Sequence, residues 1–249
     1  MPTLVHCGYH KCLTVYTDRC FRHVLGDRFR NFFGKLEIFY AEHARLAVSG
    51  TSDYCPDLSK LGDYRISRFI RDPRDLVVSG YFYHHRALDP FSTIVSPTAE
   101  QWRTAGAIPQ ALRQGESYVQ CLQRLDQADG LIAEMEFRAP HFRAMLEWPA
   151  ADPRIRVWRY EDVLGNEVQV MDAIGAHFEW PDDDHPSSFR ERLRSEADRW
   201  RMRDSLLAWD KHPRDPKAGQ WQQLFTPKVR RRFDELYGDL PARLGYEPC

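Results

Sequence analysis

The 249-residue sequence contains no long apolar run, no internal repeat and no paired cysteine motif, and each absence excludes a class of protein. No stretch reaches the roughly eighteen apolar residues of a membrane-spanning helix, and residues 1–10 lack the basic and apolar regions of a signal peptide. We therefore expect no transmembrane segment and a cytoplasmic location. The six cysteines stand apart, without the spacing of a zinc site, so we expect free thiols and no bound metal.

Net charge is also nearly absent. Lysine and arginine number 35 and aspartate and glutamate number 36, so the formal net charge at pH 7 is -1. This balance gives no overall attraction to nucleic acid or to an anionic membrane, and we expect neither as a partner. With 43% hydrophobic residues the chain is long enough for one packed core, and we expect a single domain over residues 1–249.

Short strand patterns alternate with helical patterns along the chain. This alternation is typical of an α/β fold, in which a central parallel sheet is flanked by helices. Strands are predicted over residues 3–9, 64–70 and 155–160, and helices over residues 14–25, from Pro73 onward and over about 168–178.

Two other segments show weaker patterns. Residues 87–114 hold three prolines and little strand pattern, so we expect an irregular segment. Residues 181–216 include an amphipathic piece over 189–209, which we interpret as a lid.

The first candidate site is residues 8–14 (GYHKCLT), between the first predicted strand and its helix. Backbone N–H groups at a helix start attract anions, Lys11 adds a positive charge, and the Thr14 hydroxyl adds a donor. The spacing is not that of a Walker A loop. From this loop alone, an ordinary turn with an exposed lysine is an equal alternative.

The second candidate site begins at Arg71, where the second predicted strand ends. Ligands of open α/β sheets bind at the carboxyl ends of the strands, and an arginine there can hold a phosphate with two donors. Ser79, in the following helix, adds a hydroxyl. We interpret Arg71 as a phosphate ligand, and Arg74 as paired with acidic neighbours on the surface.

Together these segments resemble two motifs of the sulfotransferases that use 3'-phosphoadenosine 5'-phosphosulfate (PAPS). Residues 8–14 resemble the loop that binds the 5'-phosphosulfate, and residues 71–79 resemble the motif that binds the 3'-phosphate. The resemblance implies a P-loop-NTPase-like sulfotransferase architecture. It also implies transfer of a sulfuryl group to an acceptor hydroxyl, with release of 3'-phosphoadenosine 5'-phosphate (PAP). In the first motif the implied cofactor ligands are Lys11, Cys12, Leu13 and Thr14, with Tyr16 against the adenine.

Three later segments, residues 159–162, 187–189 and 214–221, resemble further family motifs in the same order. Two departures are a leucine at position 13, where the family has glycine, and a glutamine at position 220, where it has aspartate. The resemblance adds the following residues to the cofactor site: Tyr160, Ser187, Phe189, Arg214, Lys217 and Gly219.

Lys11 is the expected catalytic cation at the leaving oxygen, but the general base is left open. Counting back from Arg71 by the family's usual spacing reaches residues 49–51, which include no histidine. An unperturbed histidine suits a base near neutral pH, and we rank His43 first. The other candidates are Asp53, Glu42, Glu37, His84 and His85.

Two other functions compete with a sulfotransferase. A nucleoside or small-molecule kinase with a degenerate phosphate loop would leave Arg71 and the 214–221 motif without a purpose. A nucleotide-binding module that has lost catalysis would explain the missing histidine. The sequence specifies neither the oligomeric state nor the acceptor, which can be a small molecule, a glycolipid or a carbohydrate.

Overall fold

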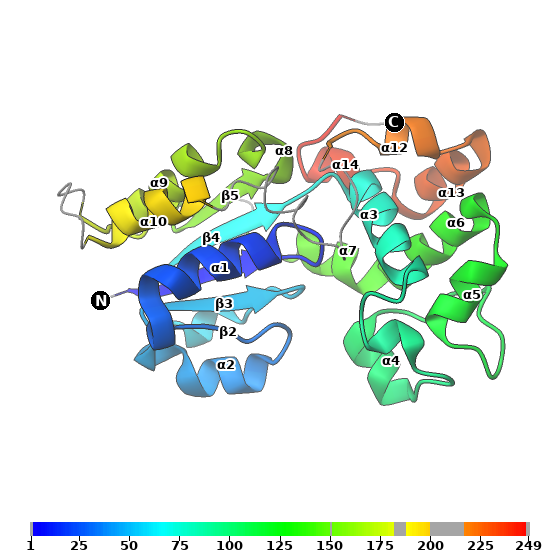
Figure 1. Ribbon diagram of the computed structural model, residues 1–249, viewed down its shortest axis with the longest axis horizontal. Helices are drawn as coiled ribbons and strands as arrows, with labels where there is room; N and C mark the ends of the chain where they lie inside the picture. Colours follow the sequence, from blue (N-terminus) through cyan, green and yellow to red (C-terminus); the bar gives the residue numbers. More distant parts are fainter. Residues whose placement is uncertain (1, 150, 182–187, 200–216, 248–249) are drawn as a thin grey trace. The chain divides into compact units, whose positions relative to one another are not determined.

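The computed structural model describes residues 2–149, 151–181, 188–199 and 217–247. The chain forms two compact units, and we describe each by itself. The sheet unit comprises Met1–Arg71 and Trp148–Pro216, and the helical unit comprises Asp72–Glu147 and Lys217–Cys249 (Figure 1). The expected organisation as a single domain stays a prediction.

The sheet unit contains five parallel strands in the order β2-β3-β1-β4-β5, which confirms the α/β class. All three strands predicted from the sequence are present. The other two were missed because β2 is only three residues long and β3 (VSGTS) is built from small and hydroxyl residues. The strands are β1 (Thr3–Gly8), β2 (Phe29–Asn31), β3 (Val48–Ser52), β4 (Tyr64–Ile70) and β5 (Ile155–Arg159).

The helices of this unit cover both faces of the sheet. The predicted helices over 14–25 and about 168–178 are confirmed as α1 and α9, and α10 lies beside α1 (Figure 1). The α-helices are α1 (Thr14–Leu25), α2 (Leu36–Glu42), α8 (Tyr160–Val163), α9 (Glu167–His177) and α10 (Phe189–Arg199), and the 3₁₀ turns are η1 (Gly26–Arg28), η2 (His43–Arg45) and η3 (Leu58–Lys60).

Alternation along the strands divides the buried side chains between the two faces. On one face, His6 of β1 packs against Phe21 of α1 and Phe69 of β4. On the other, Cys7 belongs to a cluster with Phe39 of α2. Burial lowers the pKa of His6 to about 3, so this histidine is neutral in the core.

The helical unit confirms the helix predicted from Pro73, which begins α3 and is capped by the Asp72 side chain. Residues 87–114 were expected to be irregular, but α4 lies among them. Its prolines fall outside the helix, and Thr98 and Gln101 form a capping box at its start. The helices are α3 (Pro73–His85), η4 (Phe91–Thr93), α4 (Ala99–Ala105), α5 (Tyr118–Arg124), α6 (Gln127–Phe137), α7 (Ala139–Leu146), α12 (Trp221–Leu224), α13 (Pro227–Tyr237) and α14 (Leu240–Arg243).

The amphipathic segment and the absence of membrane-spanning helices were also predicted from the sequence, and the structure describes only part of the residues concerned. The amphipathic segment over 189–209 is helical as far as Arg199, and its remainder lies outside the described residues. Among the residues that the structure describes, no helix is long and apolar enough to cross a membrane.

A buried carboxylate joins three helices of the helical unit. Glu134 of α6 accepts hydrogen bonds from Tyr118 of α5 (2.7 Å) and Arg138 (2.7 Å), and lies 2.8 Å from His84 Nδ1 of α3. Burial alone would raise the pKa of Glu134, but the charges of His84 and Arg138 and the hydrogen bonds outweigh it and lower that pKa. A carboxylate therefore stabilises the centre of this unit.

We expect Glu134→Gln to lower the free energy of unfolding by about 3–5 kcal/mol, because it leaves Arg138 buried beside an amide. The control is Asp129→Asn, which breaks an exposed pair with Lys228 and should cost less than about 1 kcal/mol. Urea unfolding measures both variants, and equal costs would contradict the assignment.

The same carboxylate predicts a loss of stability in acid. Because its pKa is lower in the folded state, its contribution is complete above the unfolded pKa of about 4.3 and is lost as the pH falls through the folded value. The Glu134→Gln variant should lack this component of the acid dependence.

Candidate active site

The candidate site lies where the parallel strands of the sheet unit end. Because all five strands run in the same direction, their carboxyl ends share one edge of the sheet. β1 lies between β3 and β4, with Gly8 opposite Ser52. The segments that follow β1, β3, β4 and β5 therefore meet at this edge. They supply Lys11, Asp53, Arg71 and Tyr160.

The loop after β1 turns through two residues in the left-handed conformation, Lys11 (φ 72°) and Leu13 (φ 63°). A hydrogen bond of 2.7 Å from Cys12 N to the Tyr9 carbonyl closes the turn. Leu13 is the position at which the resembled family has glycine, and a leucine in this conformation costs about 1–2 kcal/mol. Leu13 thus has the left-handed backbone conformation that glycine adopts easily, although its side chain makes that conformation costly.

The amino terminus of α1 faces this loop. Leu13 supplies no side-chain cap, and the first turn holds no acidic residue. The N–H groups of a first helical turn have no partner within the helix, and the helix dipole adds positive charge. With Lys11 beside it, this terminus suits a phosphate or sulfate group.

Asp53, directly after β3, braces the loop. Its N–H donates to the Gly8 carbonyl (3.0 Å), and its Oδ1 accepts from the His10 N–H (2.7 Å). Asp53 itself has φ 70°, in the left-handed region that aspartate tolerates better than most residues. The sequence offered Asp53 only as a candidate base, and its contact with the loop was not predicted.

Arg71, directly after β4, is fixed from two sides. Its Nη1 donates to the Lys11 carbonyl at 3.3 Å, and its guanidinium carbon lies 4.0 Å from the centroid of the Tyr160 ring. A guanidinium over an aromatic face is held by a cation–π interaction. Arg71 and Tyr160, from two distant motifs, are thus brought together beside the loop.

The remaining loop residues lie close by. The Thr14 hydroxyl donates to the Tyr9 carbonyl (3.1 Å), and Cys12 is fully buried. Tyr16 is also buried, and burial raises its pKa, so its phenol is neutral. Contact of Tyr16 with adenine stays a prediction.

Two predicted site residues are not brought to this edge. His43 precedes β3, at its amino end, and its Nδ1 lies 3.1 Å from the Phe39 carbonyl. Phe189 packs against Trp180 and under Arg28, which precedes the amino end of β2. Ser187 and Arg214 lie outside the described residues.

The other candidate bases have separate surroundings. Glu42 pairs with Arg30, and Glu37 lies in the first turn of α2. His84 and His85 belong to the helical unit, where His84 contacts Glu134 and the His85 ring packs on Tyr81. Glu37 lies in the first turn of the helix that follows the carboxyl end of β2, whereas Glu42, His84 and His85 lie at the far ends of their helices.

In the helical unit, Asp75 holds the carboxyl-terminal motif. Its carboxylate accepts from the backbone N–H groups of Gly219 (2.6 Å) and Trp221 (3.0 Å), and Gly219 has φ 76°, which explains the glycine. These bonds bring Lys217 and Gly219 to α3, the helix that carries Ser79.

Arg74 was expected to pair with acidic neighbours on the surface. The pair exists, but its predicted exposure is wrong. Arg74 does bond to Asp72 (2.7 Å), but both side chains are buried, and Arg74 lies 3.9 Å from the centroid of the Trp221 ring. A tryptophan from the carboxyl-terminal segment covers the pair, and a sequence pattern cannot reveal that contact.

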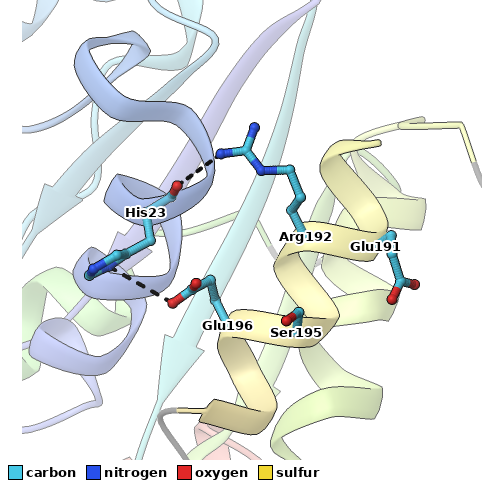
Figure 2. A pocket seen from close by; sticks show the side chains of 5 residues that line it. All are labelled: His23, Glu191, Arg192, Ser195 and Glu196. Carbon is cyan, nitrogen blue, oxygen red and sulfur yellow. Dashed lines mark hydrogen bonds and ion pairs between the residues drawn. The ribbon is translucent and has the colours of Figure 1, made fainter. Parts of the chain in front are cut away.

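A pocket of about 260 Å³ lies elsewhere in the sheet unit, between α1 and α10 (Figure 2). Arg192 donates to the His23 carbonyl (3.0 Å), and Glu196 lies 4.0 Å from His23 Nδ1. His23 belongs to the last turn of α1, whereas the phosphate-type site lies at the first turn. This pocket is therefore separate from the candidate site.

We expect Asp75→Asn to weaken the attachment of the carboxyl-terminal motif, because an NH₂ group, which is a donor, replaces one of the two oxygens that accept these N–H groups. Loss of a buried acceptor typically costs about 1–3 kcal/mol, so the Gly219 and Trp221 amides should exchange their hydrogens about tenfold faster or more. The matched control is Asp239→Asn, an exposed change on the same unit. Unchanged exchange at both amides would refute the role of Asp75.

Known proteins resemble this chain in structure and not in sequence. No family model matches the sequence, and no curated protein matches it. Mouse sulfotransferase SULT7A1 complexed with PAP is similar in structure, with a TM-score of 0.58, 16% identity, and coverage of 96% of this chain and 84% of that chain. Retinol dehydratase in complex with androsterone and the inactive cofactor PAP gives a TM-score of 0.50, 14% identity, and coverage of 96% and 81%.

These similarities extend over nearly the whole chain, and their parallel sheet flanked by helices is the architecture that the motifs implied. At identities of 14–16%, what these proteins share with this chain is the fold. On that basis the chain has the fold of the PAPS-dependent sulfotransferases.

Proposed function

We propose that this protein transfers the sulfuryl group of PAPS to an acceptor hydroxyl and releases PAP. One observation carries the proposal. Lys11, the uncapped start of α1 and the Arg71–Tyr160 pair meet at one edge of the sheet. Two anion-binding positions and an aromatic ring lie at this edge, and PAPS presents two anionic groups on a purine nucleoside.

The donor set fits this nucleotide in charge and arrangement. The start of α1 and Lys11 would hold the 5'-phosphosulfate, since both lie directly after β1. Arg71 would hold the 3'-phosphate with a forked pair of donors, and Tyr160 keeps the guanidinium in place. Ser79, Lys217 and Gly219, together with Arg214 and Ser187, stay part of the proposed cofactor site.

In the proposed reaction the acceptor oxygen forms a bond to sulfur while the bond from sulfur to the bridging phosphate oxygen breaks. The electron pair of the broken bond stays on PAP. Lys11 would neutralise charge on that oxygen, and the loop N–H groups would hold the phosphate during departure. The acceptor proton passes to a base of the protein.

For the base we place Asp53 ahead of His43. Asp53 follows the carboxyl end of β3 and is bonded to the loop that carries Lys11, whereas His43 precedes the amino end of β3. The bond from the His10 N–H occupies Asp53 Oδ1, and a carboxylate has a second oxygen that can accept the proton of an acceptor.

A kinase would leave the Arg71–Tyr160 pair without a ligand. An inactive binding module would use Lys11 and Arg71 in the same way, and turnover with labelled PAPS distinguishes it from a sulfotransferase. A cytoplasmic location stays part of the proposal, and nucleic acid is not an expected partner.

We expect PAP to raise the melting temperature of the protein without magnesium, whereas magnesium-ATP does not. Arg71→Ala should weaken PAP binding about 10–150-fold, because a charge-assisted contact contributes about 1.5–3 kcal/mol. Adenosine 5'-monophosphate, which lacks the 3'-phosphate, should bind both proteins alike in calorimetry. Equal weakening of the two nucleotides would assign Arg71 to another role, and stabilisation by magnesium-ATP alone would favour a kinase.

We expect Asp53→Asn to lower kcat about 10²–10⁴-fold while PAP affinity stays near the wild-type value. An asparagine can still accept the His10 N–H, so the loop is preserved while the proton acceptor is lost. His43→Gln is the matched comparison and should retain its turnover. The assay follows transfer from labelled PAPS to acceptors found by screening, and the reverse pattern would restore His43 as the base.

A further inference from the structure

The first residue of the loop after β1 holds the turn that follows it. The Tyr9 carbonyl accepts the Cys12 N–H (2.7 Å) and the Thr14 hydroxyl (3.1 Å), and Lys11 lies within the turn that the first of these bonds closes. Lys11 and Leu13 have positive φ, and such conformations persist only where the surrounding structure enforces them. The position of Tyr9 therefore decides where the strained turn lies.

The side chain of Tyr9 is fixed from outside the loop. Its hydroxyl accepts a hydrogen bond of 2.7 Å from Trp148 Nε1, and both side chains are buried. Burial raises the pKa of the Tyr9 phenol, so the phenol is neutral. Trp148 stands 139 positions later in the sequence, where the chain enters the second segment of the sheet unit. It belongs to none of the motifs that resemble the sulfotransferase family.

A buried arginine holds Trp148 and Tyr9 together. The guanidinium carbon of Arg68 lies 4.8 Å from the centroid of the Trp148 ring and 5.5 Å from that of the Tyr9 ring. Arg68, on β4, is the register partner of Cys7 on β1, and Trp148 belongs to the same buried cluster as Cys7. A guanidinium over two aromatic faces stabilises both by cation–π interactions. The three side chains thus form one buried group, the Tyr9–Arg68–Trp148 stack.

The stack is a third support of the loop, besides Asp53 and Arg71. Those two residues contact the loop backbone at His10 and at Lys11. Packing in the core would anchor the indole of Trp148 whichever acceptor its N–H found. The acceptor is the side chain of Tyr9, whose carbonyl closes the turn, so a displacement of the indole also displaces the loop.

We propose that Trp148, acting through Tyr9, is a positioning residue for the loop that binds the 5'-phosphosulfate of PAPS. This inference rests on the proposed function. The bond from Trp148 fixes Tyr9, and Tyr9 fixes the turn that presents Lys11 and the first N–H groups of α1 to the anion. Donors that are already ordered bind an anion more tightly than donors that binding must order. The 3'-phosphate would be held by Arg71, which its strand and Tyr160 position.

The test compares two nucleotides that share the 3'-phosphate. PAP carries the 5'-phosphate that the loop would hold, and adenosine 3'-monophosphate lacks it. Tyr9→Phe and Trp148→Phe each remove the hydrogen bond and keep an aromatic ring. In calorimetry we expect each variant to bind PAP about 3–10-fold more weakly and adenosine 3'-monophosphate with unchanged affinity. The two effects should not add in the double variant, because both substitutions remove the same bond.

Tyr64→Phe is the matched control. Tyr64 is a buried tyrosine of the same unit, and its hydroxyl donates to Asp152 (2.6 Å), but it lies at the amino end of β4, away from the loop. This variant should lose stability and still bind both nucleotides as the wild type does. If Tyr9 served stability alone, Tyr9→Phe would behave in the same way.

Each outcome bears on a stated proposal. Equal weakening of both nucleotides in the Tyr9→Phe and Trp148→Phe variants, or no weakening of either, would overturn the positioning role, while PAP binding by the wild type would uphold the nucleotide site. Additive effects in the double variant would show that the two side chains act separately and would also overturn it. Failure of the wild-type protein to bind PAP would overturn the proposed function and this role with it.

Discussion

The parallel pairing of β1 with both β3 and β4 is the constraint on which the sheet unit depends. β1 ends between two parallel neighbours, β3 and β4. The loop after β1 therefore lies between the residues that come directly after β3 and β4. Asp53 therefore reaches the loop from one side and Arg71 from the other, each through a backbone group of the loop. An antiparallel neighbour would end at the opposite edge and could supply neither contact.

Backbone strain is concentrated at the same edge. Of the seven non-glycine residues with positive φ in the described ranges, four follow β1, β2 or β3, namely Lys11, Leu13, Phe33 and Asp53. Such conformations cost about 1–3 kcal/mol each and persist only where surrounding bonds enforce them. Here the strands and the bonds to Gly8, His10 and Ser52 enforce them. A rigid sheet thus holds the loop that we propose binds the nucleotide.

In the helical unit, α3 is held by close packing of a buried ion pair and by hydrogen bonds to Asp75. Gly80 of α3 has no room for a side chain, because an added Cβ would lie 2.0 Å from Glu134 Oε1 and 2.5 Å from Arg138 Nη2. The buried ion pair thus packs directly on the helix backbone beside Ser79. Asp75, one turn earlier, ties the carboxyl-terminal motif to the same helix. Both contacts join segments far apart in the sequence, where no local pattern signals them.

The sequence by itself determined the alternation of strands and helices, the loop with Lys11, and the position of Arg71 and Tyr160 at the ends of strands. These features are local, because strand periodicity, a helix start and a charged residue at a strand end are visible within a few residues. Only the tertiary structure decided that Asp53 braces the loop, that His43 lies at the opposite end of β3, and that Phe189 contacts Arg28. Those placements follow from the strand order, and β2 and β3 were too short and too polar to predict. The order of the strands in a parallel sheet depends on how the whole unit packs. No single segment of the sequence contains that information.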